Sequence, residues 1–107
     1  MTLILSSAPS QKEAMELSRL MIGEHLAACV NIVPKALSIY EWRGEVKEEQ
    51  ECLLLIKTSK KNEKSLIDFI QKHHSYEVPE IVLLEANAEA AYKDWLYGQC
   101  ADENCAD

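Results

Sequence analysis

The apolar positions of the 107-residue chain fall into blocks whose spacing predicts four strands and three helices. Short apolar runs and stretches rich in β-branched and aromatic residues predict strands over residues 2–6, 28–42, 45–58 and 81–86, the last of them buried. Apolar residues at helical spacing predict helices over residues 10–26, 60–74 and 88–97. Ser10 and Glu13 form a capping box at the start of the first helix, and Trp95 is predicted on the buried face of the last.

The order of these elements predicts an α+β protein with the ferredoxin-like sandwich fold. Strand, helix, strand, strand, helix and strand follow one another, and a C-terminal helix is added. Right-handed crossovers around a central hairpin then give an antiparallel sheet with helices on one face. We expect residues 1–98 to form a single domain and residues 99–107, which include Cys100 and Cys105, to form a flexible, exposed acidic tail.

The second and third strands are predicted to form a long hairpin. Arg43 and Gly44 suit a two-residue turn, because glycine readily takes a positive φ. Pro34 cannot donate to the sheet ladder, so we expect a kink, a bulge or an edge position there. An arm of about 14 residues spans about 45 Å at about 3.4 Å per residue, whereas a domain of this size has a radius of gyration of about 13 Å.

The hairpin tip is therefore expected to extend beyond its own domain. It carries Ile39, Tyr40 and Trp42, and an exposed apolar arm either aggregates or packs on another subunit. We infer a homo-oligomer in which the hairpin makes contacts between subunits. The alternative is a bent hairpin that folds back on the core of its own chain.

Composition and charge exclude several classes of partner. Hydrophobic residues make up 48% and charged residues 27% of the chain, which is typical of a globular protein. The formal net charge of −7 argues against binding to nucleic acid or to anionic membranes, since both need a basic surface. No apolar run approaches a membrane span, and the start lacks the basic flank of a signal peptide, so we expect a cytoplasmic protein. The four cysteines are expected to be free thiols, with Cys29 and Cys52 in the core.

The segment HHSYEVPE is the strongest candidate for a metal site. His73, His74 and Glu77 offer the imidazole and carboxylate ligands that suit zinc or copper. Adjacent helical residues point about 100° apart, so both histidines can bind one ion only at a frayed helix end. The alternative is structural: one histidine covers the helix end and Tyr76 packs on the sheet.

Two further features bear on function. The EEQE run at 48–51, together with Glu45, forms either a cation-attracting surface or a solvated strand face. The sequence contains no GxSxG, P-loop or HExxH motif, so we expect no catalytic activity.

Several blocks together resemble the CutA divalent-cation-tolerance family. They cover residues 2–97 and read SAP, HLAACVNIVP, SIYEWRGEV, LLLIKT, HHSYEVPEI and YKDWL. The resemblance implies the ferredoxin-like sandwich and a homotrimer with its hairpins wrapped between subunits. Tyr40, Glu41, Trp42 and Gly44, beside Ile39, would then belong to the subunit interface.

The resemblance also implies a non-catalytic role in the response to divalent cations, copper above all. The proposed copper site of some members combines a cysteine at the end of the first strand with two histidines. His73 and His74 match those histidines, whereas Ser6 holds the cysteine position. Serine is a poor ligand for Cu(I), so weak binding of copper or zinc through histidine is expected.

A second function follows from the likeness of this fold and trimer to the PII signalling proteins. Small effectors would then bind between subunits, near Tyr76, Glu77 and the hairpin. A bound organic anion would be the mark of that alternative.

Overall fold

The computed structural model describes residues 1–100, which form one antiparallel sheet and three helices. The elements in chain order are β1 (Thr2–Ala8), α1 (Gln11–Gly23), β2 (Cys29–Trp42), β3 (Glu45–Thr58), a 3-10 turn (Lys60–Asn62), α2 (Glu63–His73), β4 (Val82–Glu85) and α3 (Ala90–Gln99).

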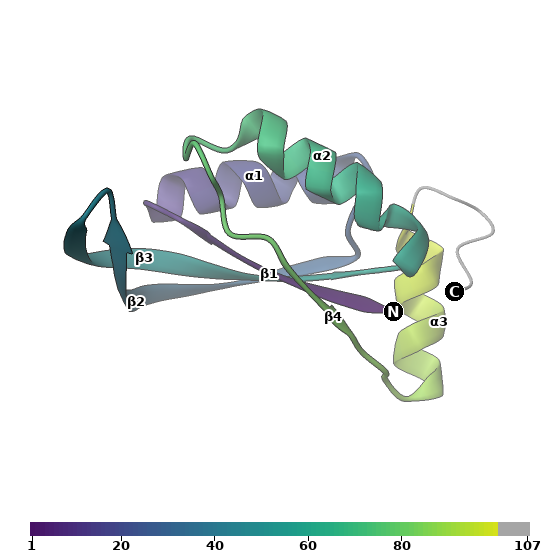
Figure 1. Cartoon of the computed structure of the whole chain (residues 1–107). Helices are drawn as coiled ribbons and strands as arrows, with labels where there is room; N and C mark the ends of the chain where they lie inside the picture. The colour runs from purple at the N-terminus through teal and green to yellow at the C-terminus, as the bar shows by residue number, and fades with distance from the viewer. Residues whose placement is uncertain (101–107) are drawn as a thin grey trace.

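The strands lie in the order β2-β3-β1-β4, and every neighbouring pair is antiparallel. Both α1 and α2 lie on one face of this sheet, and α3 stands at the end near the N-terminus (Figure 1). This arrangement confirms the predicted ferredoxin-like fold. No helix in residues 1–100 combines the length and apolar character needed to cross a bilayer.

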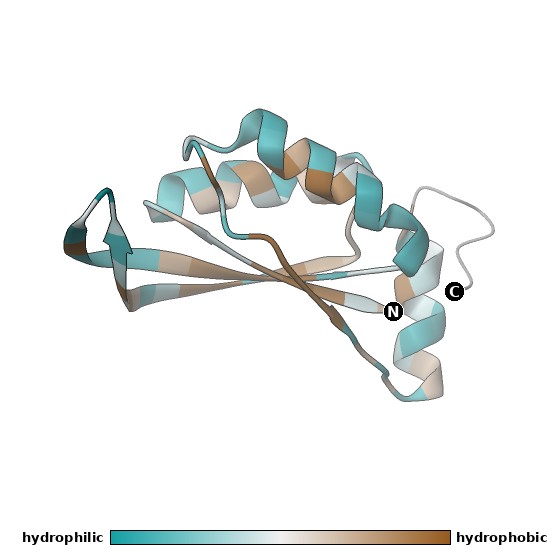
Figure 2. Cartoon of the chain, in the orientation of Figure 1, coloured by the Kyte–Doolittle hydropathy of each residue, from teal (hydrophilic) through white to brown (hydrophobic). Residues whose placement is uncertain are grey.

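The main core lies between the sheet and the two helices that cover it. Apolar segments occur in both helices and along the strands that they cover (Figure 2). The largest side chains that are fully buried there are Ile4, Met21, Leu54, Ile56, Leu66 and Ile70. Over the first five residues of β1, buried side chains alternate with half-buried ones, because successive residues of a strand point to opposite faces.

A second, smaller core joins α3 to the start of β2. Leu96 is fully buried and packs with Ala28 and Cys100. The prediction that Cys100 is exposed is therefore wrong, because this thiol covers the end of α3 and is 8% exposed. Cys105 lies outside the described residues. Cys29, predicted in the core, is only half-buried, whereas Cys52 is buried as expected.

The hairpin of β2 and β3 confirms two local predictions. The register shifts between Val33 and Ala36, so the bulge falls at Pro34, followed by Lys35 with a φ of 61°. Arg43 and Gly44 have φ values of 51° and 84°, the two positive angles of a type I′ turn. The turn twists in the same sense as the strands and keeps the two arms paired to the tip.

The long axis of the molecule measures 45 Å against 25 Å and 22 Å for the other two. The hairpin accounts for this shape, because it extends well beyond the helical layer (Figure 1). Its outer half exposes large apolar side chains, among them Ile39 at 64% and Val46 at 71%. The arm thus projects from the body of its own chain.

Two predictions about burial are wrong. The strand near residue 82 was expected to be buried, yet Val82, Leu83 and Leu84 are each 39–44% exposed at the sheet edge. Trp95 is 47% exposed, while its neighbour Leu96 is fully buried. A shift of one residue turns a helical side chain by about 100°, so α3 packs through a different face from the one predicted.

Candidate functional site

The candidate site forms where the loop after α2 meets the end of β1 and the root of the hairpin. His74 ends α2 with extended backbone angles, and its side chain is completely buried. The segment from Ser75 to Ile81 then leads into β4. Pro79 disfavours helix in Val78, the residue before it, so the chain stays non-helical in this part of the loop.

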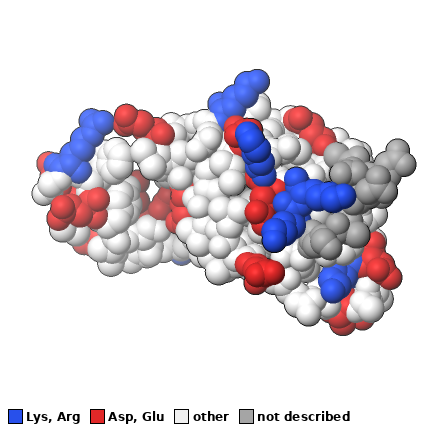
Figure 3. Space-filling model, turned by 45° about the vertical axis from the view of Figure 1, so that its right-hand side comes forward, with Lys and Arg blue, Asp and Glu red and all other residues white. Residues whose placement is uncertain are grey.

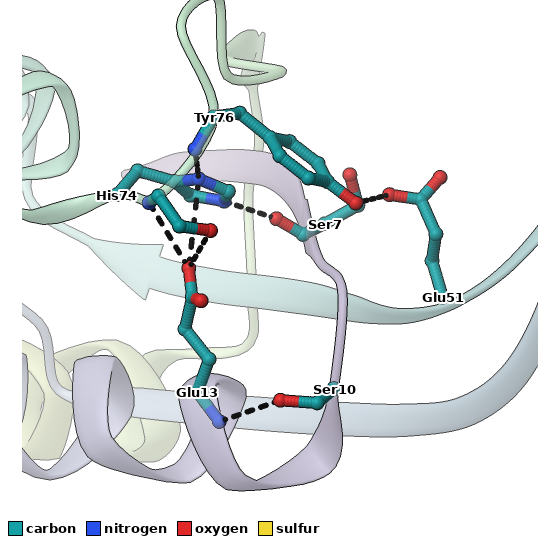
Figure 4. A network of polar contacts seen from close by, with 7 residues as sticks. Ser7, Ser10, Glu13, Glu51, His74 and Tyr76 are labelled. Atoms are coloured by element: carbon teal, nitrogen blue, oxygen red, sulfur yellow. Dashed lines mark hydrogen bonds and ion pairs between the residues drawn. The ribbon is translucent and has the colours of Figure 1, made fainter.

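His74 holds the loop against β1 through both ring nitrogens. Its Nε2 lies 2.6 Å from the carbonyl oxygen of Ser7, and its Nδ1 accepts the backbone N–H of Tyr76 at 3.0 Å (Figure 4). A carbonyl only accepts, so the ring hydrogen of this tautomer is on Nε2. Both nitrogens therefore have a partner within the chain.

Glu13 fastens the same loop from the other side. Its Oε2 accepts hydrogen bonds from the backbone N–H of Ser75 at 3.1 Å and from the Ser75 hydroxyl at 2.8 Å. Ser10 does cap α1, since its hydroxyl accepts the backbone N–H of Glu13 at 3.2 Å. The predicted return bond of the capping box is replaced, because the Glu13 carboxylate reaches across to the loop instead (Figure 4).

Tyr76 connects the loop to the hairpin. Its hydroxyl donates to Oε2 of Glu51 at 2.7 Å, and its ring lies 4.7 Å from that of His74. Burial, and then the hydrogen bond to the Glu51 carboxylate, raise the pKa of Tyr76 well above its usual range. The phenol therefore keeps its proton at neutral pH and acts as a donor.

Glu51 is a functional candidate that sequence reasoning missed. It closes a run of glutamates that was interpreted as a solvated strand face or a cation-attracting surface, yet only 7% of it is exposed. The one sequence feature that could have indicated its burial is its position at the border between the charged and apolar halves of β3. Its partner Tyr76 is 25 residues away, so the sequence could not show the contact.

These contacts border an open pocket of about 530 Å³. It is lined by the hairpin between Tyr40 and Glu51, by the loop between Ser75 and Glu80, and by Ser7 of β1. Acidic side chains are visible in the hollow between the projecting hairpin and the body of the molecule (Figure 3). An exposed ion pair between Arg43 and Glu77, 3.1 Å apart, spans its rim.

The structure separates the predicted metal ligands. His73 is exposed, its Nδ1 lies 3.0 Å from the carbonyl oxygen of Phe69, and its ring stacks on that of Phe69 at 4.2 Å. His74 is buried, and Glu77 is turned toward Arg43. Within residues 1–100, no three histidine, cysteine, aspartate or glutamate side chains gather closely enough to hold a metal ion.

Ser6, at the position where the resemblance places a cysteine, lies in the interior. It is 2% exposed, and its Oγ is the one fully buried side-chain polar atom in the described part of the chain without a hydrogen-bond partner. The predicted interface residues, by contrast, all lie in the outer part of the hairpin or its turn. These residues are Ile39, Tyr40, Glu41, Trp42 and Gly44.

Comparison with known proteins gives one consistent family. A family model described as CutA1 divalent ion tolerance protein matches residues 2–99. A divalent-cation tolerance protein CutA of Thermus thermophilus is 46% identical over 94 residues, which are 87% of this chain and 91% of that protein. The human Protein CutA is 38% identical over 91 residues, 84% of this chain but only 51% of the human protein.

Solved structures agree with this family. A Thermus thermophilus divalent cation tolerance protein superposes with a TM-score of 0.89 at 43% identity, covering 94% of this chain and all of that one. A PII-like protein CutA from Nostoc superposes with a TM-score of 0.86 at 35% identity, covering 92% of this chain and 96% of that one. With the fold, the loop and the family model in agreement, the chain belongs to the CutA1 divalent ion tolerance protein family.

Proposed function

We propose that this protein is a non-catalytic homotrimer that binds divalent metal cations, such as copper or zinc, weakly and takes part in tolerance to them. The observation that carries this proposal is the family match over residues 2–99. The cytoplasm is the proposed location, in keeping with the free thiols of Cys29, Cys52 and Cys100.

His73 is the side chain best prepared to bind an ion. The Phe69 carbonyl oxygen can only accept, so Nδ1 of His73 donates and the lone pair of this tautomer is on Nε2. Stacking on Phe69 holds the ring in place. Imidazole nitrogen suits Cu(II) and Zn(II), and Glu77 could add a carboxylate oxygen once it leaves Arg43.

His74 is less available than the sequence suggested. It would have to release Ser7 or Tyr76 before it could bind an ion through a lone pair. The predicted set of His73, His74 and Glu77 therefore supplies at most a partial shell from one chain. Zinc and copper usually take four ligands, so water or a second subunit would complete the shell and binding would be weak.

The homotrimer is supported by apolar surface that a single chain leaves uncovered. Leu37 and Ile39 on the hairpin are 66% and 64% exposed, and the edge strand β4 exposes Val82 and Leu84 at 44% each. An uncovered apolar arm and an uncovered apolar sheet edge favour association with further strands. The predicted interface at the hairpin tip belongs to the same proposal.

Calorimetric titration of Cu(II) and Zn(II) tests the metal proposal. Wild-type protein is compared with His73→Ala, His74→Ala and, as a matched control, His25→Ala on the loop after α1. Wild-type and the His25 variant should bind alike, and His73→Ala should weaken binding by about tenfold or more. Equal binding by wild-type and His73→Ala would overturn the site, and absence of binding by wild-type would overturn the function.

A second candidate function is binding of a small effector, as in PII-like proteins. The pocket of about 530 Å³ beside Tyr76 and Glu77 favours it, because volumes of a few hundred Å³ suit small molecules. Co-purification of an organic compound that occupies this pocket, with no metal, would support this candidate over the first.

A further inference from the structure

The charge of the pocket limits the kind of ligand that it can hold. Four glutamates and two basic residues line it: Glu49, Glu51, Glu77, Glu80, Arg43 and Lys47. Both cations are already engaged, since Arg43 pairs with Glu77 at 3.1 Å and Lys47 with Glu45 at 3.1 Å. Glu49, Glu51 and Glu80 have no cationic partner within residues 1–100. The pocket therefore attracts a cation and repels the organic anion expected from the sequence.

Glu51 supplies a hydrogen-bond acceptor in the lining of this pocket. The residue is more than nine-tenths buried, and Tyr76 occupies its Oε2. No described residue donates to its Oε1. That oxygen is in contact with solvent. If it were completely buried, it would be a second buried side-chain atom without a partner, and Ser6 Oγ is the only such atom in residues 1–100. A largely buried carboxylate with one open oxygen favours a ligand that brings N–H donors.

The walls are suited to an organic cation rather than a metal ion. The carboxylates do not converge, since no group of three metal-ligating side chains exists within residues 1–100. Three aromatic residues, Tyr40, Trp42 and Tyr76, instead line the same space. Aromatic faces attract organic cations, whereas they offer no ligand to a metal ion.

At the rim of the pocket, Arg43 already contacts both an aromatic ring and a carboxylate. Its guanidinium carbon lies 5.5 Å from the centre of the Trp42 ring while its nitrogen pairs with Glu77. A positive, planar N–H donor between an aromatic face and a carboxylate is the arrangement that an incoming organic cation would reproduce deeper in the pocket. The Arg43 side chain is 73% exposed, so this pair lies at the outer edge of the site.

We propose that the pocket binds a small organic amine in its ammonium form, with the nitrogen donating to Oε1 of Glu51 and the apolar part lying against Tyr40 and Tyr76. The inference rests on the second candidate function, because it names the class of effector that the pocket would take. It does not depend on metal binding at His73.

Three probes of similar shape separate charge from hydrogen bonding. Benzylammonium is a cation with N–H donors, benzyltrimethylammonium is a cation without them, and benzoate is an anion. Calorimetry on the full chain, in buffer free of amines and divalent metals, gives their affinities. We expect benzylammonium to bind most tightly, the quaternary cation at least about threefold more weakly, and benzoate not at all.

Variants assign the binding to the pocket. Glu51→Gln keeps an acceptor for Tyr76 but loses the charge, and it should weaken benzylammonium binding by about tenfold or more. Glu49→Gln, on the pocket wall, should weaken it by a smaller factor. Glu48→Gln is the matched control, because Glu48 lies on the same strand, does not line the pocket and makes the same change in net charge. The affinity of Glu48→Gln for benzylammonium should stay within about twofold of that of the wild-type protein.

Each result has a defined meaning. Equal loss in Glu48→Gln and Glu51→Gln would overturn the assignment to the pocket, since it would reflect net charge alone. Equal affinity for the quaternary cation would overturn the role of Glu51 as hydrogen-bond acceptor. Binding of benzoate alone, or of none of the three, would overturn the inference. The effector function itself would then still be decided by whether an organic compound co-purifies in the pocket.

Discussion

The imidazole Nε2 of His74 lies 2.6 Å from the carbonyl oxygen of Ser7, in a fully buried position. This contact joins the end of α2 to the end of β1 and fixes the loop that carries Tyr76. One of the two histidines predicted as metal ligands thus has a structural partner on each ring nitrogen.

His74→Ala should lower the free energy of unfolding by about 2–4 kcal/mol, because it leaves a cavity and two backbone groups without their partner. His73→Ala is the control from the neighbouring, exposed position and should change it by less than about 1 kcal/mol. Urea denaturation at one fixed protein concentration measures both. Similar losses in the two variants would contradict the structural role assigned to His74.

Tyr76 should make stability depend on alkaline pH. Its pKa is raised above the usual value of 10.0 in the folded state, mainly by burial. The folded chain holds this proton more tightly than the unfolded chain. The stabilisation is therefore complete below about pH 10 and is lost as the pH rises toward the raised pKa.

The comparison with Tyr76→Phe isolates this effect, because both proteins share all other titrating groups. The difference in unfolding free energy between wild-type and Tyr76→Phe should shrink between about pH 8 and about pH 11. Denaturation at a series of pH values measures it. A difference that stayed constant or grew would argue against the raised pKa.

Trp42→Ala should weaken assembly. Trp42 is 40% exposed near the hairpin tip, where a large aromatic side chain can anchor a subunit contact. We expect the dissociation midpoint in a sedimentation dilution series to rise by about tenfold or more. Leu20→Ala is the control, since Leu20 is also exposed, at 46%, but lies on α1. Equal effects of both substitutions would remove the hairpin tip from the interface.

Ser6→Ala should leave the free energy of unfolding unchanged or raise it by up to about 1 kcal/mol, because it removes a buried hydroxyl that has no partner. Ser18→Ala provides the comparison: Ser18 is also buried, but its hydroxyl donates to the carbonyl oxygen of Ala14 at 2.7 Å. Thermal unfolding of both variants ranks them. A larger loss for Ser6→Ala than for Ser18→Ala would show that Ser6 has a partner after all.

Local chemistry explains which parts of the fold could be predicted. The bulge at Pro34 and the turn at Arg43 and Gly44 follow from backbone preferences that each residue carries by itself. The buried face of α3 was harder to predict, because Trp95 and Leu96 are neighbours and only tertiary packing decides which of them turns inward. The edge strand β4 reads as buried because its apolar residues fit a covered strand, although its own chain leaves it half-exposed.

The candidate site was predictable as a region rather than as a set of contacts. The segment from His73 to Glu77 could be identified because the chain has only three histidines and two of them are adjacent there. The partners of this segment could not, since Ser7, Glu13 and Glu51 lie 67, 62 and 25 residues from the residues that they bind. The sequence records a glutamate run, and only the fold shows that its last member is buried against a tyrosine.

The most direct test of the proposed function is a crystal structure of the protein soaked with Cu(II) or Zn(II), with anomalous scattering recorded at the metal edge. We predict a threefold assembly of the chain, with an anomalous peak beside Nε2 of His73 and further ligands from Glu77, water or a neighbouring subunit. A monomer with no peak at the end of α2 would contradict both the assembly and the site.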